Sequence, residues 1–339
     1  MLIGSPVNRR RLTGFESSDG LLFLAKGFSL FLTDSRYIEA AKAAVTACPV
    51  EELSDAAKQL RALCKEHRIK RLLVETQHTT LAQASRLRKN LPGVWIETQD
   101  SRVDKRMRDI RMHKTPEEID CIRRAQAIAE ASFDYILGIV KPGITEREIA
   151  LELDYAVLRG GAQGLSFETI AVAGENGSKP HGVPGKRALQ TGDLLTLDFG
   201  AVIDGCHSDM TRTVAIGEPG EEQRRIYQTV LEAQQAALEM LAPGVACSDI
   251  DKRARDIIEA AGYGEHFRHG TGHGVGLEIH EAPTLSRKSK DVLAPGMVVT
   301  VEPGIYLPGK CGARIEDMAL ITEAGYENLT KTDKNLIIL

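Results

Sequence analysis

The chain has 339 residues, 42% of them hydrophobic, so it can bury a substantial core, and its length favours two domains over one. Its 43 Lys and Arg residues nearly balance its 47 Asp and Glu residues, and the net charge of −4 excludes the broad basic surface that binds nucleic acid or anionic membranes. The six cysteines form no CxxC pair and are typical of a reduced protein: Cys48, Cys64, Cys121, Cys206, Cys247 and Cys311.

The first 110 residues predict a small α/β domain. Apolar runs at 21–25, 30–33, 71–74 and 94–97 alternate with helix-like stretches at 36–48, 54–67 and 80–90. The N-terminus lacks the features of a signal peptide, and no stretch approaches the length and apolar character of a membrane span. We therefore expect a cytoplasmic protein. The charged segment 101–114 is interpreted as the connection to a second domain, so that the predicted domains are residues 1–110 and 111–339.

Two successive helices are predicted at the start of the second domain. Thr115 with Glu118, and Thr145 with Glu148, have the spacing of a capping box, in which the side chains at the start of a helix satisfy its free amides. Pro116 is at the first helical position, where proline is favoured. We expect the first helix to end at the Lys-Pro-Gly turn of residues 141–143, and the second to end at a pair of glycines.

The second domain contains an internal repeat. Residues 140–161 match residues 241–262, and residues 189–202 match residues 293–306. This second match aligns Asp198 with Glu302. With a small insertion in the second copy, His181 also aligns with His280, so acidic and histidine residues recur at equivalent positions. We interpret the pattern as a duplication.

Each copy of the repeat has two carboxylates in or next to its predicted strands. Asp198 lies within an apolar strand, where an unpaired charge would be costly to bury, and Asp209 opens a second strand-like run. In the second copy Glu302 follows an apolar strand and Glu316 precedes another. Four carboxylates near one point repel strongly, so we expect divalent cations to hold them together, and the ligand count favours two ions.

The segment HGTGHGVGLEIH, residues 269–280, adds an imidazole to this set. Its alternating glycines let the backbone pack closely and leave the histidines projecting. We choose His273 as the ligand. An oxygen-rich set with one imidazole suits Mn²⁺, Co²⁺ or Fe²⁺ and tolerates Zn²⁺, and Mn²⁺ is our preferred assignment.

These motifs resemble a known family. The segments TLDFGAVIDGCHSDMTRT, HGTGHGVGLEIHE, VEPGIY and RIEDMALIT resemble the metal-site blocks of the pita-bread metallopeptidases, specifically the prolidase and aminopeptidase P group. The segments SPVNRRRLTGFESSDGLLFLAKG and LFLTDSRYIEAA resemble the creatinase-like N-terminal domain of that group. The resemblance implies an α/β (α+β) protein, in which a small α/β N-terminal domain precedes a pita-bread catalytic domain with an internal two-fold repeat.

The resemblance also implies roles for individual residues. Five residues would ligate the metals, with the first and last bridging: Asp198, Asp209, His273, Glu302 and Glu316. Substrate-binding and proton-transfer roles fall to His181, His269 and His280, and a supporting role falls to Arg314, which we expect to hold the Glu316 carboxylate. Glu302 is our candidate to accept the proton of the attacking water. The family commonly has tyrosine where Cys206 stands, and His207 is also unusual, so we expect an altered pocket wall.

The expected function is dinuclear metal-dependent hydrolysis of the bond between an N-terminal residue and proline, as in an Xaa-Pro dipeptidase or aminopeptidase P. The expected partners are small peptides with proline in second position and a second copy of the chain in a homodimer, with no nucleic acid or membrane. Three alternatives stay open: an aminopeptidase without a proline requirement, a hydrolase of non-peptide C–N bonds, and a non-catalytic binding protein with the same fold.

Overall fold

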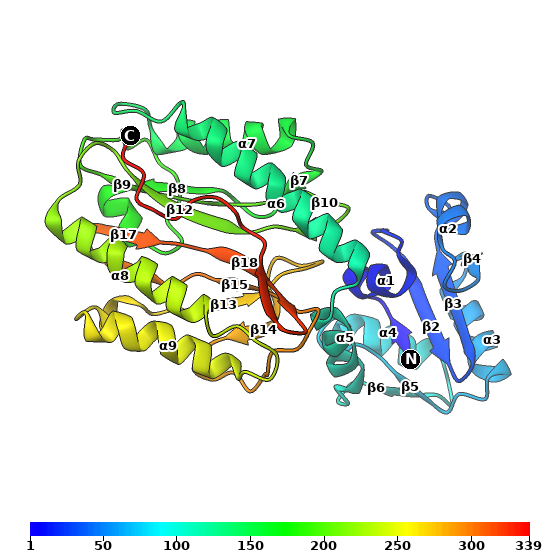
Figure 1. The fold of residues 1–339 in the computed structure, drawn as a ribbon. Helices are drawn as coiled ribbons and strands as arrows, with labels where there is room; N and C mark the ends of the chain where they lie inside the picture. The colour runs from blue at the N-terminus through cyan, green and yellow to red at the C-terminus, as the bar shows by residue number, and fades with distance from the viewer. The chain divides into compact units, whose positions relative to one another are not determined.

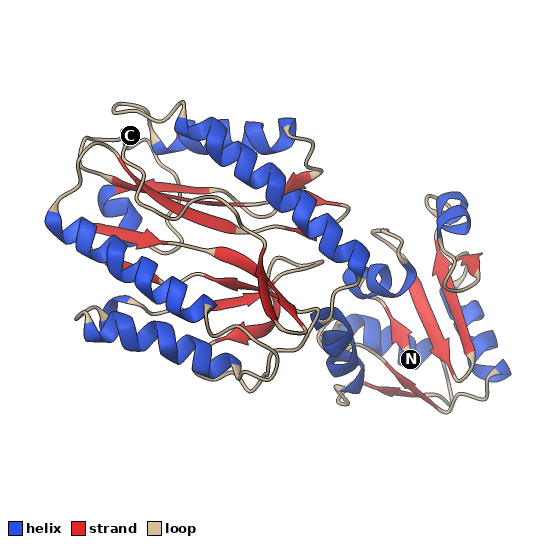
Figure 2. Cartoon of the chain, viewed as in Figure 1, coloured by secondary structure: helices blue, strands red, loops and turns tan.

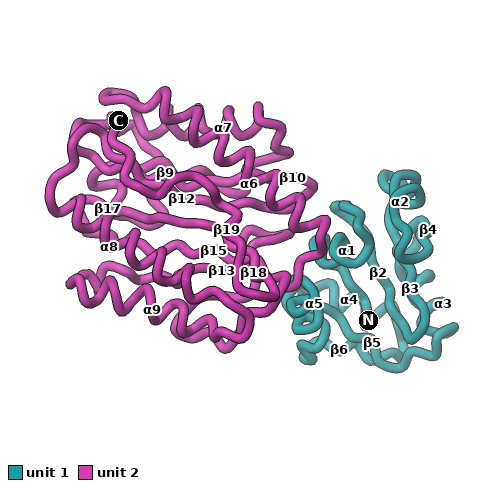
Figure 3. Tube along the Cα trace, viewed as in Figure 1, with its two compact units in different colours: residues 1–111 teal, residues 112–339 magenta.

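The computed structural model describes residues 1–339 and divides into two compact units, Met1–Arg111 and Met112–Leu339 (Figure 3). None of its helices combines the length and the apolar character that crossing a membrane would require.

The first unit contains two small sheets with helices between the strands (Figure 1). Its larger sheet has the order β1-β2-β3-β4, and the smaller one pairs β5 with β6 in parallel. The strands are β1 (Leu2–Ile3), β2 (Leu21–Ala25), β3 (Phe28–Thr33), β4 (Val50–Glu52), β5 (Arg71–Leu73) and β6 (Trp95–Glu97). The helices are α1 (Pro6–Thr13), α2 (Ile38–Ala44), α3 (Ala56–Glu66), α4 (Leu81–Asn90) and α5 (Arg102–Met112), the last of which ends at the boundary of the unit.

Helix α5 occupies most of the charged segment that the sequence suggested was only a connection. Val103 and Met107 lie four residues apart, therefore on one face of the helix, and are almost completely buried. They pack in one cluster with Ile3 and Phe31 of the first unit. The charge of the remaining positions concealed this short apolar face.

The second unit begins with the two predicted helices, α6 (Pro116–Leu137) and α7 (Glu146–Arg159). Both capping boxes are present: the Thr115 hydroxyl accepts from the Glu118 amide at 3.2 Å, and the Thr145 hydroxyl accepts from the Glu148 amide at 3.2 Å. Helix α6 ends at Leu137 with Gly138 as its C-cap, four residues before residue 141.

The strands of this first half form two three-stranded sheets, with the orders β12-β9-β8 and β11-β10-β7. They are β7 (Gly164–Leu165), β8 (Ile170–Ala173), β9 (Leu194–Phe199), β10 (Ala201–Ile203), β11 (Cys206–His207) and β12 (Met210–Ala215), and the 3₁₀ helix η1 (Gly174–Ser178) follows β8. Helices α6 and α7 share one buried apolar cluster with β8, β9 and β12.

The second half repeats this plan with helices α8 (Glu221–Leu238) and α9 (Cys247–Ala260) (Figure 2). Its five-stranded sheet has the order β14-β13-β15-β18-β19, and β16 pairs with β17 in a ribbon. The elements after α9 are the 3₁₀ helix η2 (Gly264–His266) and the strands β13 (Gly272–Gly274), β14 (Glu281–Leu285), β15 (Val298–Val301), β16 (Gly304–Leu307), β17 (Cys311–Arg314), β18 (Asp317–Thr322) and β19 (Gly325–Asn328).

Backbone geometry supports the internal repeat. Gly192 and Gly296, aligned in the sequence, both have left-handed backbone angles, with φ of +91° and +84°. The same holds for Gly143 and Gly244, with φ of +92° and +87°. Because residues other than glycine adopt this conformation only at a cost, the matched glycines place equivalent turns in the two halves.

Candidate metal centre

The four predicted carboxylates converge where the two halves meet. In the first half β9 pairs with β12, so that Asp198 lies opposite Thr211, and Asp209 stands immediately before β12. In the second half Glu302 directly follows β15 and Glu316 directly precedes the paired strand β18. A bridge between Thr211 and Glu316 then joins the halves, which brings residues about a hundred positions apart together.

His273 completes this cluster. One oxygen each from Asp209 and Glu316 and one ring nitrogen of His273 all lie within 4.8 Å of one another. The Nε2 atom of His273 is 3.6 Å from Asp209 Oδ2 and 3.3 Å from Glu302 Oε1. Its Nδ1 atom lies 3.1 Å from the carbonyl oxygen of Gly274. A hydrogen bond from Nδ1 to this carbonyl leaves Nε2 as the nitrogen that can coordinate an ion.

The glycines on either side of His273 are required by close backbone contacts. A Cβ atom at Gly272 would lie 2.0 Å from the carbonyl oxygen of Thr300, and one at Gly274 would lie 2.3 Å from that of Ala282. Any side chain would therefore push β13 away from its neighbours. The alternating glycines let this strand lie between β14 and β15 and hold the imidazole beside the carboxylates.

Burial and mutual repulsion raise the pKa of three of the carboxyl groups. For Asp209 and Glu316 burial is the main cause and the neighbouring carboxylates add to it, while for Asp198 burial outweighs the opposing charge of Arg314. Asp198 Oδ1 and Glu316 Oε1 are buried and have no hydrogen-bond partner. Because buried oxygens are rarely left unsatisfied, these two atoms and the clustered acids fit the binding of divalent cations.

Glu302 differs from the other acids of the cluster. Burial would raise its pKa, but the hydrogen bond with His273 and the positive charge of that ring outweigh burial and lower the pKa to about 2. The hydroxyl of Thr300 also donates to Glu302 Oε1 at 3.3 Å. Glu302 is therefore ionised at neutral pH.

Arg314 contacts a different carboxylate from the one predicted. Its Nη2 atom donates to Asp198 Oδ2 at 2.5 Å, whereas Glu316 accepts a hydrogen bond from the Thr211 hydroxyl at 2.7 Å. Arg314 therefore supports Glu316 only through Thr211, whose hydroxyl accepts from Arg314 Nε at 3.1 Å and donates to Glu316.

A chain of hydrogen bonds links Arg314 to the glycine-histidine segment. Arg314 Nη1 donates to the Tyr306 hydroxyl at 2.7 Å, and that hydroxyl lies 3.0 Å from His269 Nε2. Because His269 Nδ1 lies 2.8 Å from the Gly270 carbonyl, it is the donating nitrogen, and Nε2 accepts from the tyrosine. Sequence reasoning missed Tyr306, although it ends the VEPGIY block.

Asp251 is a second residue that the sequence analysis missed. It is completely buried, and its Oδ1 atom accepts hydrogen bonds from the backbone amide and the hydroxyl of Thr271 at 3.0 and 2.9 Å. Its other oxygen accepts from Arg255 at 2.6 Å, and Arg255 also donates to the carbonyls of Phe267 and His269. The i,i+4 spacing of this pair on α9 was its only sequence signal.

All nine predicted site residues line one cavity of about 570 Å³. His181 and His280 are exposed there, and the rings of His280 and His273 are 4.3 Å apart. Burial lowers the pKa of His280, and the positive charges of His273 and His181 lower it further. Cys206 and His207 are not among the residues that line this cavity.

Comparison with known proteins assigns this architecture to a family. The model of metallopeptidase family M24 matches residues 120–323, and the creatinase/prolidase N-terminal domain matches residues 1–113. The chain is 41% identical to an uncharacterized peptidase of Bacillus subtilis over 100% of its own length and 95% of that protein. It is 44% identical to an Xaa-Pro dipeptidase of Pyrococcus furiosus over 70% of its length and 68% of that protein.

Two solved structures are similar over the full chain. An Xaa-Pro dipeptidase from Bacillus anthracis has a TM-score of 0.95 at 38% identity, covering 100% of this chain and 94% of that one. An X-Pro aminopeptidase from Thermotoga maritima has a TM-score of 0.91 at 32% identity, covering 100% and 97%. These similarities confirm the predicted fold class. The chain belongs to metallopeptidase family M24 and carries the creatinase/prolidase N-terminal domain.

Proposed function

We propose that the protein hydrolyses the peptide bond between an N-terminal residue and proline, using two divalent metal ions. One observation carries the proposal: four converging carboxylates beside a single imidazole, with two buried carboxylate oxygens that have no hydrogen-bond partner. The curated and structural relatives named for Xaa-Pro cleavage support the choice of substrate. The proposed ligands are Asp198, Asp209, His273, Glu302 and Glu316, with Asp198 and Glu316 bridging.

Mn²⁺ is our proposed ion, because hard oxygen ligands with one imidazole suit it. When bound, two such ions supply an acidified water and an electrophile for the substrate carbonyl. The chain itself provides the proton transfer. Glu302 lies beside His273 and lines the cavity, so its carboxylate would accept a proton from the attacking water and deliver it to the leaving nitrogen. The nitrogen of a proline peptide carries no hydrogen, so this delivery is required for release.

His181 and His280 are proposed to bind the scissile carbonyl from the cavity wall. Both line the cavity and are exposed. A donor placed before the reaction begins stabilises the charge that develops on the carbonyl oxygen. The His269 ring, which accepts from Tyr306, is proposed to position the wall beside them.

A substrate panel tests the function. The purified protein, stripped of metal and reconstituted in turn with Mn²⁺, Co²⁺ or Zn²⁺, is assayed against Ala-Pro and Ala-Ala dipeptides. We expect cleavage of Ala-Pro only after metal is added. Equal cleavage of both would support an aminopeptidase without a proline requirement, and absence of bound metal and of cleavage would support a binding protein.

The Glu302→Gln variant tests the proton-transfer role. We expect its turnover number at saturating metal to fall by about 10²-fold or more, from the lower end of the range for loss of a general base upward, because the amide cannot accept the proton. Its KM should change much less. An unchanged turnover number would remove Glu302 from this role.

We assign catalysis to residues 111–339, since every proposed site residue lies in the second unit, and we treat residues 1–110 as a separate domain. The six cysteines are scattered along the chain without a CxxC pair, which suits a reducing compartment, so we propose a cytoplasmic location. A homodimer, which the family resemblance implies, is tested by light scattering of the eluted protein.

A further inference from the structure

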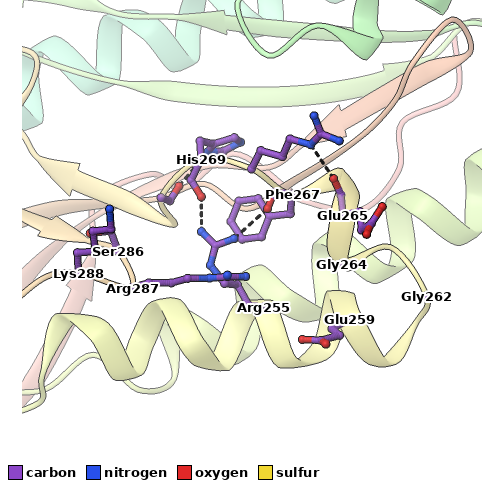
Figure 4. A pocket seen from close by; sticks show the side chains of 12 residues that line it. Arg255, Glu259, Gly262, Gly264, Glu265, Phe267, His269, Ser286, Arg287 and Lys288 are labelled. Atoms are coloured by element: carbon purple, nitrogen blue, oxygen red, sulfur yellow. Dashed lines mark hydrogen bonds between the residues drawn. The ribbon is translucent and has the colours of Figure 1, made fainter.

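A second hollow adjoins the catalytic cavity and is larger than it. Its volume is about 890 Å³, and it lies between the end of α9, the η2 segment and the loop after β14 (Figure 4). The two hollows share three lining residues, His269, Gly270 and Ser286. A peptide leaving the catalytic cavity along this border therefore enters the second hollow.

A dipeptide does not need this additional space. The catalytic cavity alone lies within the range of about 300–1,000 Å³ that encloses a small ligand. None of the five proposed metal ligands lines the second hollow, and neither His181 nor His280 does. The second hollow thus contains none of the proposed reacting groups and borders the cavity that holds them.

The end of the hollow that adjoins the catalytic cavity is positively charged. Arg287 and Lys288 directly follow the shared Ser286, whereas Arg268, which also lines the hollow, donates from Nε to the carbonyl oxygen of Glu265 at 2.9 Å. Arg287 and Lys288 are both exposed. They are therefore accessible to a charged group that enters from the catalytic side.

The acidic residues of the hollow lie elsewhere. Glu259 and Glu265 are at the opposite end from Ser286 and Arg287 (Figure 4). A fourth cation, Arg255, is paired with the buried Asp251 at 2.6 Å and holds backbone carbonyls, so its charge is already compensated. Arg287 and Lys288 are therefore the cations that lie beside the border with the catalytic cavity and away from the acidic residues of the hollow.

We propose that this site also takes Xaa-Pro peptides longer than a dipeptide, and that Arg287 and Lys288 bind a carboxylate carried by the residue after proline. The proposal rests on the proposed function and specifies its substrate class. The cations repel a terminal ammonium group and attract a carboxylate, so charge alone directs the C-terminal part of the peptide into the second hollow. Consecutive Cα atoms are about 3.8 Å apart, so one further residue moves the carboxylate clearly beyond that of a dipeptide.

Two sources can supply the carboxylate: the C-terminus of a tripeptide or an acidic side chain. Four peptides, assayed with the Mn²⁺-loaded protein, distinguish the two sources of the carboxylate: Ala-Pro, Ala-Pro-Ala, Ala-Pro-Ala amide and Ala-Pro-Glu amide. We expect kcat/KM for Ala-Pro-Ala to exceed that for its amide by about fivefold, the factor that one exposed ion pair of about 1 kcal/mol supplies. Ala-Pro-Glu amide should regain the advantage if a side-chain carboxylate also reaches the cations.

Charge-neutralising variants identify the cations. Arg287→Gln, Lys288→Gln and the double variant should each reduce the acid-to-amide ratio, and the double variant should bring it close to one. Lys290→Gln is the matched control, because Lys290 is an exposed cation of the same loop that lines neither hollow. Its ratio should equal that of the wild type. Added salt should lower the wild-type ratio, since exposed charges are screened.

The outcomes separate this inference from the proposed function. Cleavage of Ala-Pro together with equal rates for acid and amide tripeptides would overturn the inference alone. An acid-to-amide ratio that persists in the double variant would do the same. Failure to cleave any of the four proline peptides with any metal would overturn both.

Discussion

Replacement of Arg314 by methionine should destabilise the metal-free protein far more than the metal-loaded protein. The Arg314 side chain is buried, and it donates to Asp198 Oδ2, the Thr211 hydroxyl, the Tyr306 hydroxyl and the Pro180 carbonyl. Methionine has a similar length but no charge, so Asp198 loses its cation. Removal of one partner from a buried ion pair costs about 3–5 kcal/mol.

Bound metal changes this cost, because Asp198 is also a proposed ligand. With ions present its charge remains compensated when Arg314 is lost. The loss of unfolding free energy caused by the substitution should then be about 2 kcal/mol smaller with metal than without it. This difference is the contribution of one hydrogen bond to a charged group. The contacts to Tyr306 and Pro180 are lost in both states, so some destabilisation persists with metal.

The assay is urea unfolding followed by far-UV circular dichroism, with chelator or with Mn²⁺. The only tryptophan, Trp95, lies in the first unit, so its fluorescence follows that unit separately and serves as an internal control. Arg314→Lys is the matched variant, since it keeps the charge but not the planar fork. Equal losses of unfolding free energy with and without metal would refute the link between Arg314 and the proposed ion site.

Three further results are expected. Asp209→Ala and His273→Ala should lose bound metal by elemental analysis along with turnover, and full occupancy in both would remove the ligand assignment. His181→Ala and His280→Ala should keep both metals but lose about 10²-fold or more in turnover, the cost of one preorganised donor, and near-normal rates would show that they are misplaced. Asp317→Asn should lower the unfolding free energy by about 3–5 kcal/mol, because it weakens a completely buried ion pair 2.8 Å long, and an unchanged urea midpoint would contradict this.

The positions of the candidate ligands could be predicted because each is encoded locally. Asp198 interrupts an apolar strand, and Glu302 follows one in the aligned position of the repeat. Asp209 and Glu316 stand at the starts of strands that pair with these two, and antiparallel pairing of neighbouring strands brings such positions together. The internal repeat thus indicated that the candidate ligands lie at the same end of each strand pair.

The partners of the site residues could not be predicted in the same way. Arg314 and Asp198 are 116 positions apart in the chain, and their contact depends on how β17 lies against β9. Helix α5 was overlooked because its apolar face is short, formed by Val103, Met107 and Ile110 among charged neighbours. Asp251 looks like an ordinary surface acid of α9 in the sequence, and only tertiary packing makes it the support of Thr271.

The two halves of the duplicated unit are not equivalent at the proposed centre, and strand register explains why. Gly274 pairs with Val299, so His273 lies next to Thr300, whose hydroxyl accepts from the His273 amide at 3.0 Å. In the first half Val172 pairs with Thr196, the residue aligned with Thr300. Val172 is buried and apolar, so it occupies the position of the imidazole but cannot bind an ion. Duplication therefore supplies two pairs of carboxylates, whereas the single histidine of the second half would give two bound ions different surroundings.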